Sequence, residues 1–216
     1  YTTLFRSYDQ LSQDVCINKS PVTIAVFAAS VYGMSDVTHL GIYDIPMISN
    51  IPELVYLAPV TKEEYLAMLD WSLEQKEHPV AIRVPASLVS DGKPFTKDLS
   101  KLYKYEITQQ GSQVAFIALG SFYGLGVEAA KLIEKKTGVK ATVINPYYIT
   151  GSDKEMLESL KADHKIVITL EDGVLEGGFG EKIARFYGDS DVKTLCFGLE
   201  KKFYDQIGRA SCRERV

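Results

Sequence analysis

Apolar runs that alternate with amphipathic stretches constrain the fold of this chain more than any other feature. Val22–Ala29, Val114–Leu119 and Lys165–Leu170 are nearly continuous in apolar residues, which is typical of parallel strands buried on both faces. Between such runs, Lys62–Glu77 carries apolar residues at helical spacing, with Thr61 in the N-cap position. The alternation predicts an α/β fold with a mainly parallel sheet.

The alternation stops once, over residues 86–106, where Ser, an Asp-Gly-Lys-Pro stretch and a mixed charge cluster replace it. We interpret this segment as an interdomain linker between a unit at 8–85 and a unit at 107–206. In the first unit we expect helices at 9–18 and 62–77, strands at 22–29, 54–59 and 79–84, and a loop at 32–41. In the second we expect strands at 114–119, 139–145, 165–170 and 192–197, and helices at 124–137, 152–162 and 178–187, with Gly138 as a stop and Ser152 or Asp153 as a cap.

The two ends differ from the rest of the chain. Residues 1–7 (YTTLFRS) can be encoded TACACGACGCTCTTCCGATCT, and the reverse complement of that DNA, read from its third base, encodes the IGRASC of residues 207–212. Two segments of one natural protein have no reason to be antisense translations of each other. We therefore interpret 1–7 and 207–216 as adapter-like sequence, exclude them from the fold, and expect a longer parent protein.

Composition excludes several classes of protein. The 216 residues are 46% hydrophobic and 24% charged with a net charge of −4, which is typical of soluble globular proteins and argues against a nucleic-acid partner. No apolar run approaches the ~18–20 residues of a membrane span, so no membrane partner is expected. Three cysteines form no disulfide framework, which favours a reducing cytoplasm, and Cys16 and Cys196 are expected to be buried and inert.

The sequence Thr38-His39-Leu40-Gly41 lies in the loop after the first predicted strand. Ligands of open α/β sheets bind beyond the carboxyl ends of strands, where a histidine can move protons near pH 7. His39 is thus a candidate catalytic residue, the alternative being a loop histidine with a structural hydrogen bond. His78 and His164 favour structural roles, and no residues show metal-ligand spacing.

Two glycine-rich stretches and one acidic pair complete the candidates. Residues 120–126 (GSFYGLG) and 177–180 (GGFG) lie at predicted helix starts, where backbone N–H groups can face a phosphate. Neither is a P-loop or a full dinucleotide fingerprint, so close helix–strand packing is favoured. Glu171 and Asp172 end a predicted strand, and the sequence leaves open whether they point into a cleft or into solvent.

An ordered set of short motifs resembles a known family. Residues 8–85 are similar to the pyrimidine-binding domain of the 1-deoxy-D-xylulose-5-phosphate synthases, which are thiamine-diphosphate enzymes of the transketolase superfamily. Residues 107–205 are similar to the C-terminal domain of that superfamily. The matching motifs are Tyr8-Asp9-Gln10, Pro21-Val22, Thr38-His39-x-Gly41, Asp44, Ile51-Pro52, Ala58-Pro59, Ala81-x-Arg83-x-Pro85, Ala118-Leu119-Gly120-Ser121, Val143-Ile144-Asn145-Pro146, Thr169-Leu170-Glu171-Asp172 and Gly177-Gly178-Phe179-Gly180.

The resemblance implies two parallel or mixed three-layer α/β/α domains. It implies a carboligase that uses thiamine diphosphate and Mg²⁺, acts on small-molecule substrates in isoprenoid biosynthesis, and forms a cytoplasmic homodimer. The histidine of the T-H-x-G motif lies beside the reacting carbon of the cofactor in this superfamily, so the resemblance assigns a catalytic role to His39.

Departures from the family pattern limit what carries over. The catalytic glutamate and the domain that binds diphosphate and Mg²⁺ lie upstream of Tyr8 in the family, so we expect this fragment to be inactive alone. The two arginines that grip the substrate phosphate are Ala28 and Ala86 here, while Ser35 with Asp36, and Arg83, remain as candidate substrate-binding residues. The alternatives are a transketolase or 2-oxoacid dehydrogenase E1-type subunit with another donor or acceptor, and a non-catalytic assembly or regulatory module.

Overall fold

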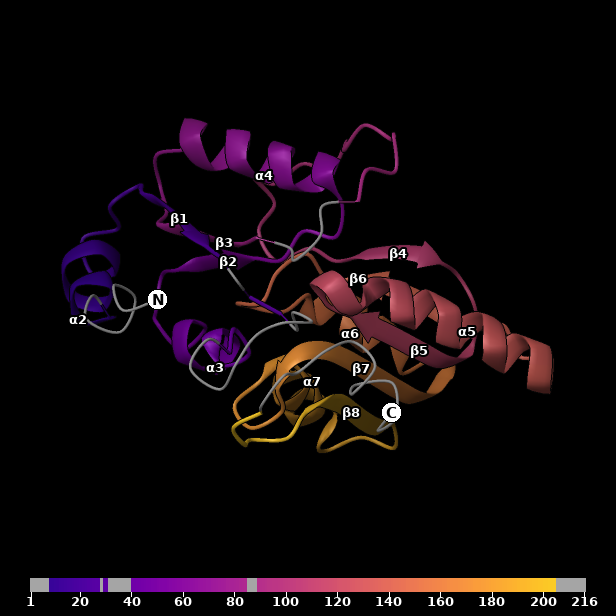
Figure 1. Cartoon of the computed structure of the whole chain (residues 1–216). Helices are drawn as coiled ribbons and strands as arrows, with labels where there is room; N and C mark the ends of the chain where they lie inside the picture. Colours follow the sequence, from indigo (N-terminus) through magenta and orange to yellow (C-terminus); the bar gives the residue numbers. More distant parts are fainter. Residues whose placement is uncertain (1–7, 28, 31–39, 85–88, 205–216) are drawn as a thin grey trace.

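Two β-sheets form the centres of two packed units in the computed structural model (Figure 1). The structure describes residues 8–27, 29–30, 40–84 and 89–204. The first sheet has the strand order β1-β3-β2, and the second has the order β4-β6-β5-β7-β8. This arrangement confirms the predicted α/β class with one parallel and one mixed sheet.

The three strands of the first sheet run parallel, and its central strand is buried along its whole length. Figure 1 shows α4 on one side of this sheet and α3 on the other. The sequence of the central strand, VAIR, supplies the apolar side chains that such burial needs on both faces. The elements of this unit are α2 (Tyr8–Gln10), the π-helix η1 (Leu11–Cys16), β1 (Thr23–Val26), α3 (Asp44–Ile48), β2 (Val55–Leu57), α4 (Lys62–Glu74) and β3 (Val80–Arg83).

The second sheet separates two layers of helices. Along β5, Ala115 and Ile117 pack in the apolar cluster that includes residues of α6 and α7, whereas Phe116 and Ala118 pack in the cluster that includes α5. This alternation follows from the two-residue repeat of a strand. The elements are β4 (Glu106–Gln109), β5 (Gln113–Ala118), the 3₁₀-helix η2 (Gly120–Phe122), α5 (Tyr123–Thr137), β6 (Thr142–Asn145), α6 (Lys154–Leu160), β7 (His164–Val174), α7 (Phe179–Tyr187) and β8 (Lys193–Leu199).

Local capping signals place the helix ends. The Thr61 hydroxyl accepts a hydrogen bond from the Glu64 N–H at 3.2 Å, which confirms the predicted cap of α4. Of the two candidate caps of α6, Asp153 is the one that accepts from the Met156 N–H, also at 3.2 Å. Gly138 ends α5 with a φ of 74°, the left-handed conformation that glycine adopts without steric cost.

Some elements differ from the prediction. Helix α3 and strand β4 were not predicted, because both are short and β4 carries only one apolar side chain, Ile107, at the edge of its sheet. β4 runs antiparallel to β6, which makes the second sheet mixed. The helix predicted over 9–18 consists of α2 and η1, and the strand predicted over 165–170 continues to Val174 as β7 because its pairing with β8 reaches Leu199.

The two units are joined by backbone hydrogen bonds as well as by apolar packing. The Ala58 N–H donates to the Tyr147 carbonyl at 2.7 Å, and the Ile149 N–H donates to the Tyr56 carbonyl at 2.8 Å. The Tyr56 N–H donates to the Thr150 hydroxyl at 2.9 Å. One apolar cluster includes residues of both units, so the units share a continuous core.

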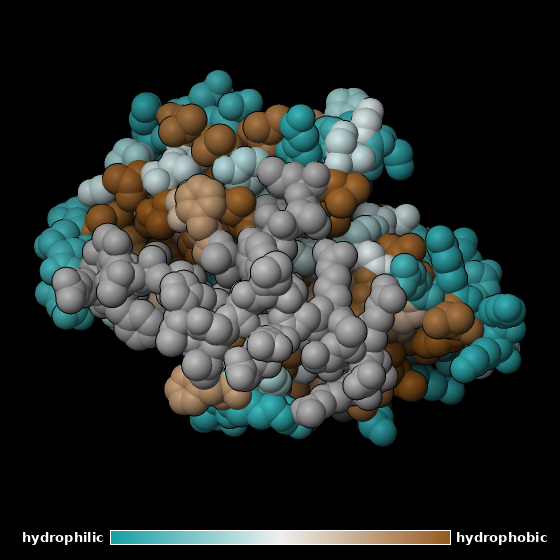
Figure 2. All heavy atoms as spheres, in the orientation of Figure 1, coloured by the Kyte–Doolittle hydropathy of each residue, from teal (hydrophilic) through white to brown (hydrophobic). Residues whose placement is uncertain are grey.

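Large apolar side chains are exposed near β1. Ile17, which caps η1, is 72% exposed, and Phe27, which directly follows β1, is 66% exposed. Figure 2 shows apolar atoms gathered over the region of the three-stranded sheet.

Candidate functional site

The carboxyl ends of four strands meet at the border between the two units. A small cavity there is lined by residues that follow β1, β2, β3 and β5 or end them, namely Ala29, Ala58, Pro59, Arg83, Val84, Gly120 and Ser121. Both units contribute to this edge. It is the position at which ligands of open α/β sheets bind, as expected for the loop that carries His39.

The two ends of that loop are held together. The Ser30 N–H donates to the Gly41 carbonyl at 2.8 Å, and the two residues form an isolated antiparallel bridge. His39, Ser35 and Asp36 lie between these ends but outside the described residues, as do Ala28 and Ala86. Their predicted roles stay predictions. The structure does describe the paired ends of this loop, Ser30 and Gly41, which we call the loop base.

Arg83, at the end of β3, lies in a buried cluster of charged and polar groups. Its Nε donates to Asp44 Oδ2 at 2.8 Å, its Nη2 donates to Asp44 Oδ1 at 3.1 Å, and its Nη1 donates to Asp172 Oδ1. The Tyr56 hydroxyl donates to Asp44 Oδ2 at 2.5 Å. Asp44 begins α3 and Asp172 lies in β7, so the cluster spans both units.

The cluster holds Arg83 as a cation. Burial alone would lower the pKa of Arg83, but the charges of Asp172 and Asp44 outweigh burial and raise this pKa well above its usual value. The Arg83 side chain is only 4% exposed. Its donors point at carboxylates and at the Gly41 carbonyl, 3.4 Å away, rather than into open space. The substrate-binding role of Arg83 stays a prediction, while the geometry gives it an ion-pairing role.

Glu171 and Asp172 lie neither in a cleft nor in solvent, so neither of the two alternatives left open by the sequence holds. Both are fully buried. The Glu171 carboxylate accepts hydrogen bonds from the Phe179 and Gly180 N–H groups at 2.9 and 2.7 Å, and burial raises its pKa to about 7. Glu171 therefore occupies the start of helix α7, where the glycine-rich sequence offers backbone N–H groups to a phosphate.

The glycine-rich stretches serve close packing, as favoured by the sequence. A Cβ atom on Gly126 would lie 2.7 Å from the Ala118 Cβ, and one on Gly180 would lie 2.5 Å from the Thr169 hydroxyl. Helix α5 and helix α7 thus approach their sheet through a residue without a side chain.

The remaining candidates are structural. The His164 ring is buried, with its Nε2 2.8 Å from the Thr142 hydroxyl. Cys16 is buried as expected, but Cys196 is only partly buried. Burial raises the pKa of both thiols, which keeps them protonated and unreactive at neutral pH.

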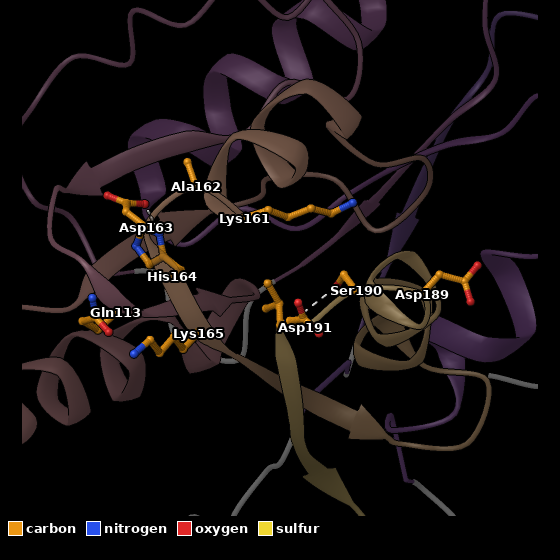
Figure 3. A pocket seen from close by; sticks show the side chains of 10 residues that line it. Gln113, Lys161, Ala162, Asp163, His164, Lys165, Asp189, Ser190 and Asp191 are labelled. Carbon is orange, nitrogen blue, oxygen red and sulfur yellow. Dashed lines mark hydrogen bonds and ion pairs between the residues drawn. The ribbon is translucent and has the colours of Figure 1, made fainter.

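Two larger hollows lie away from the loop base. One, of about 490 Å³, lies at the amino ends of β5, β7 and β8 (Figure 3), where the Asp163 and His164 side chains point toward each other. The other, of about 600 Å³, lies between the start of α4, residues 91–97 and β4. In the second hollow, Glu64 accepts from the Val60 N–H at 2.6 Å and from the Asn145 amide at 3.3 Å, and burial raises its pKa to about 7.

Two absences hold for the part of the chain that the structure describes. None of its helices combines the length and the apolar character that crossing a bilayer requires. Within the same residues, no three His, Cys, Asp or Glu side chains are grouped so that they could hold a metal ion.

Comparison with protein families identifies both units. Residues 1–91 match the model of the transketolase pyrimidine-binding domain, and residues 103–200 match the model of the transketolase C-terminal domain. The chain carries two domains of the transketolase family. The two matched ranges leave residues 92–102 between them, and this segment lies inside the predicted linker. The predicted domain boundaries at 8–85 and 107–206 stay predictions.

Two curated relatives are 1-deoxy-D-xylulose-5-phosphate synthases. The chain is 33% identical to the 1-deoxy-D-xylulose-5-phosphate synthase of Lachnoclostridium phytofermentans, over 100% of this chain and 35% of the relative. It is 35% identical to the synthase of Clostridium perfringens (strain ATCC 13124), over 91% of this chain and 32% of the relative. The chain thus spans about a third of the length of these relatives.

Solved structures share the fold of these transketolase domains. The structure described as "Split gene transketolase, inactive beta4 tetramer" matches with a TM-score of 0.75 and 21% identity, covering 98% of this chain and 67% of that one. A transketolase mutant from Pichia stipitis matches with a TM-score of 0.67 and 17% identity, covering 92% of this chain and 28% of that one. At this identity the likeness establishes the fold alone.

The sequence missed three members of the buried cluster as interacting groups: Asp44, Tyr56 and Asp172. Asp44 and Asp172 both belong to the matching motifs, and Asp172 is also one of the acidic pair, but neither pattern predicts a contact with Arg83. An apolar strand that ends in an arginine, as β3 does, is the signal that could have prompted a search for buried carboxylates, because a buried guanidinium needs them.

Proposed function

We propose that this chain is part of a thiamine-diphosphate-dependent carboligase of the 1-deoxy-D-xylulose-5-phosphate synthase type. The reaction joins pyruvate and D-glyceraldehyde 3-phosphate to give 1-deoxy-D-xylulose 5-phosphate and CO₂. The observation that carries the proposal is the 33–35% identity to such synthases across both domains. The shared edge at the carboxyl ends of β1, β2, β3 and β5 supports it, since ligands of open α/β sheets bind at an edge of this kind.

The described residues supply only a small part of a cofactor site. Ala29, Ala58 and Gly120 line the shared edge, where the cavity has a volume of about 10 Å³, too small for a cofactor ring. We propose that the diphosphate and the Mg²⁺ ion are bound by residues of the longer parent, as in the family that the chain resembles. Thiamine diphosphate supplies, when bound, a carbanion that adds to a carbonyl carbon. The proposed role of His39 is to move protons to and from the oxygen atoms of the substrate.

The acceptor phosphate is where this protein departs from the family pattern. Ala28 and Ala86 replace two phosphate-gripping arginines, and loss of one charge-assisted contact costs about 1.5–3 kcal/mol. We therefore expect a KM for D-glyceraldehyde 3-phosphate roughly tenfold or more above that of a synthase with both arginines. The same substitutions favour the second candidate, a transketolase or 2-oxoacid dehydrogenase E1-type subunit with a different donor or acceptor. For both candidates, Ser35, Asp36 and Arg83 are the proposed substrate-binding residues.

The test is an assay of the full-length gene product with thiamine diphosphate and Mg²⁺. We expect CO₂ release from pyruvate that depends on added aldehyde, and a His39→Ala variant that binds the cofactor but loses at least about 100-fold in kcat, since general acid–base groups contribute 10²–10⁴-fold. Phosphorylated and unphosphorylated aldehydes compared side by side separate the two candidates. Absence of cofactor binding would contradict both and favour a non-catalytic module.

Assembly and location are part of the proposal. We propose that the parent is a cytoplasmic homodimer and that residues 8–206 alone are inactive, because half of the cofactor site is missing. The exposed apolar side chains Ile17 and Phe27 near β1 support a covered face in the parent. A monodisperse fragment with carboligase activity would contradict this.

A further inference from the structure

We propose that the hollow of about 600 Å³ between the start of α4, residues 91–97 and β4 binds a neutral polyhydroxylated molecule of about the size of a monosaccharide. We call it the border hollow, because its lining comes from both domains and from the segment that joins them. Its volume lies within the range of roughly 300–1,000 Å³ that is typical of small-molecule sites. The border hollow has no lining residue in common with the shared edge, and its test needs no assay of activity.

Hydrogen bonds hold the rim of the border hollow against α4. The Lys62 N–H donates to the Val89 carbonyl at 3.1 Å. The Asp91 N–H donates to the Glu63 carboxylate at 3.2 Å, and the Ser90 hydroxyl donates to the same carboxylate. The joining segment thus forms a wall whose position is fixed by the first turn of α4.

The opposite wall belongs to the C-terminal domain. The Tyr147 hydroxyl donates to Glu106 Oε2, and the Tyr147 N–H donates to the side-chain oxygen of Asn145 at 3.2 Å. The Asn145 amide in turn donates to Glu64 Oε1 of α4 at 3.3 Å. Asn145 and Tyr147 are both buried, so a fixed polar pair connects this wall to the first one.

Several polar groups along the border hollow retain hydrogen-bonding capacity. Among the described residues, Glu106 Oε1 and Asp91 Oδ2 accept no hydrogen bond, although the other oxygen of each carboxylate does. The Lys97 ammonium donates to the Tyr105 carbonyl at 3.1 Å, which uses one of its three N–H groups. Hydroxyl groups both donate and accept, so a molecule with several of them can bind carboxylates and an ammonium group at once.

Aromatic side chains supply the apolar part of the lining. The rings of Phe95 and Tyr147 meet edge to face with their centroids 5.6 Å apart, and Lys97 Nζ lies 4.8 Å from the Tyr147 centroid. Phe95 and Tyr123 are each partly exposed and line the hollow. Small-molecule sites combine aromatic contact area with a few placed polar groups, and the C–H groups of a polyhydroxylated molecule can pack against such rings.

The electrostatics of the border hollow favour a neutral ligand. Burial raises the pKa of Glu64 to about 7 and lowers the pKa of Lys97, so two groups of opposite charge both shift toward their neutral forms. Surroundings of this kind penalise an ion more than a neutral molecule with hydrogen-bonding groups. An anion is also repelled, because carboxylates outnumber ammonium groups in the lining. These groups are Glu63, Glu64, Asp91 and Glu106 against Lys93 and Lys97.

The test is calorimetric titration of the full-length protein with probes of three kinds. D-glucose, D-xylose and xylitol are neutral polyhydroxylated probes, inorganic phosphate is an anion, and putrescine is a cation. Asp91→Asn and Lys97→Met alter an acceptor and a donor of the hollow. Asp98→Asn and Lys104→Met are the matched controls, because both residues are near in the chain but make their contacts outside the hollow.

We expect at least one neutral probe to bind with a Kd of about 1 mM or below, and phosphate and putrescine to bind more weakly. Asp91→Asn and Lys97→Met should each raise this Kd roughly tenfold or more, because each removes a charge-assisted hydrogen bond. The two control variants should keep the wild-type Kd. Amide hydrogen exchange of residues 91–97 and 106–109 should become slower when the neutral probe is bound.

Failure of all three neutral probes to bind would overturn the proposal, and tighter binding of phosphate or putrescine would overturn the class of ligand. Equal affinity in wild type and both hollow variants would place the bound probe elsewhere in the protein, which also contradicts the proposal. So would an equal rise of Kd in the control variants, because the substitutions would then act through the fold of the joining segment.

Discussion

At the scale of single residues, the effect of burial on a carboxyl group depends on whether a cation lies beside it. Burial raises the pKa of Glu64 and of Glu171 to about 7. Asp44 and Asp172, in contrast, form ion pairs with Arg83. Desolvation penalises an isolated carboxylate, and an adjacent guanidinium compensates for it. Carboxyl side chains therefore have two different electrostatic roles within one chain.

Glu64 makes the stability of the protein depend on pH. Its pKa is raised from 4.5 to about 7, so between these values the folded state binds the extra proton and stability falls as pH rises. Glu64→Gln removes this dependence. We expect the variant to gain stability relative to wild type from pH 4.5 to pH 8, by on the order of 1–3 kcal/mol.

Denaturant unfolding at a series of pH values measures this difference. Glu63→Gln is the control, because a hydrogen bond from Ser90 lowers the pKa of Glu63. The charged form of Glu63 therefore stabilises the folded state, and the Glu63→Gln variant should lose stability relative to wild type as the pH rises. Parallel pH profiles for wild type and Glu64→Gln would contradict the assignment.

At the scale of elements, close approach of helix to sheet depends on particular glycines. In α5, Gly126 faces Ala118 of β5, while Gly124, two residues earlier, has no described residue within 4 Å of an added Cβ. One helix therefore contains a glycine that packing requires and one that it does not.

The two glycines of α5 predict opposite effects of the same substitution. Gly126→Ala should destabilise the protein by about 1–3 kcal/mol, because an added methyl group overfills a packed interface. Gly124→Ala should stabilise it by up to about 1 kcal/mol, because alanine loses less entropy in a helix. Denaturation midpoints of the two variants test this, and a loss of stability in both would show that α5 does not lie as described.

At the scale of the whole molecule, the two domains share one core. Hydrogen bonds join Ala58 to Tyr147 and Tyr56 to Ile149, and a second apolar cluster includes Trp71 of α4 among its partly buried residues together with Tyr148 of the other domain. Domains that share backbone pairing and apolar contacts have no reason to unfold independently.

We therefore expect a single unfolding transition. The chain has one tryptophan, so the fluorescence of Trp71 reports on the pyrimidine-binding domain, while far-ultraviolet circular dichroism reports on both. The two signals should give the same thermal midpoint. A fluorescence midpoint several degrees below that of circular dichroism would show that the domains unfold separately.

The sequence by itself determined the elements with strong local signals: the strands around 80–83, 114–118 and 165–170, helices α4 and α5, and the caps at Thr61 and Gly138. Periodicity and capping depend on residues within a few positions of one another, so they can be read along the chain. Short elements such as α3 and β4 escaped because their local pattern is weak and they are stabilised by neighbours from elsewhere.

Only the tertiary structure decided the partners of the charged residues. Arg83 bonds to Asp44, 39 residues away, and to Asp172, 89 residues away, and neither pairing has a local signature. Glu171 and Asp172 are adjacent in sequence, yet one caps a helix and the other crosses the domain border, because successive side chains of a strand point to opposite faces. Whether each charge met a partner depended on which faces the packing of the two domains brought together.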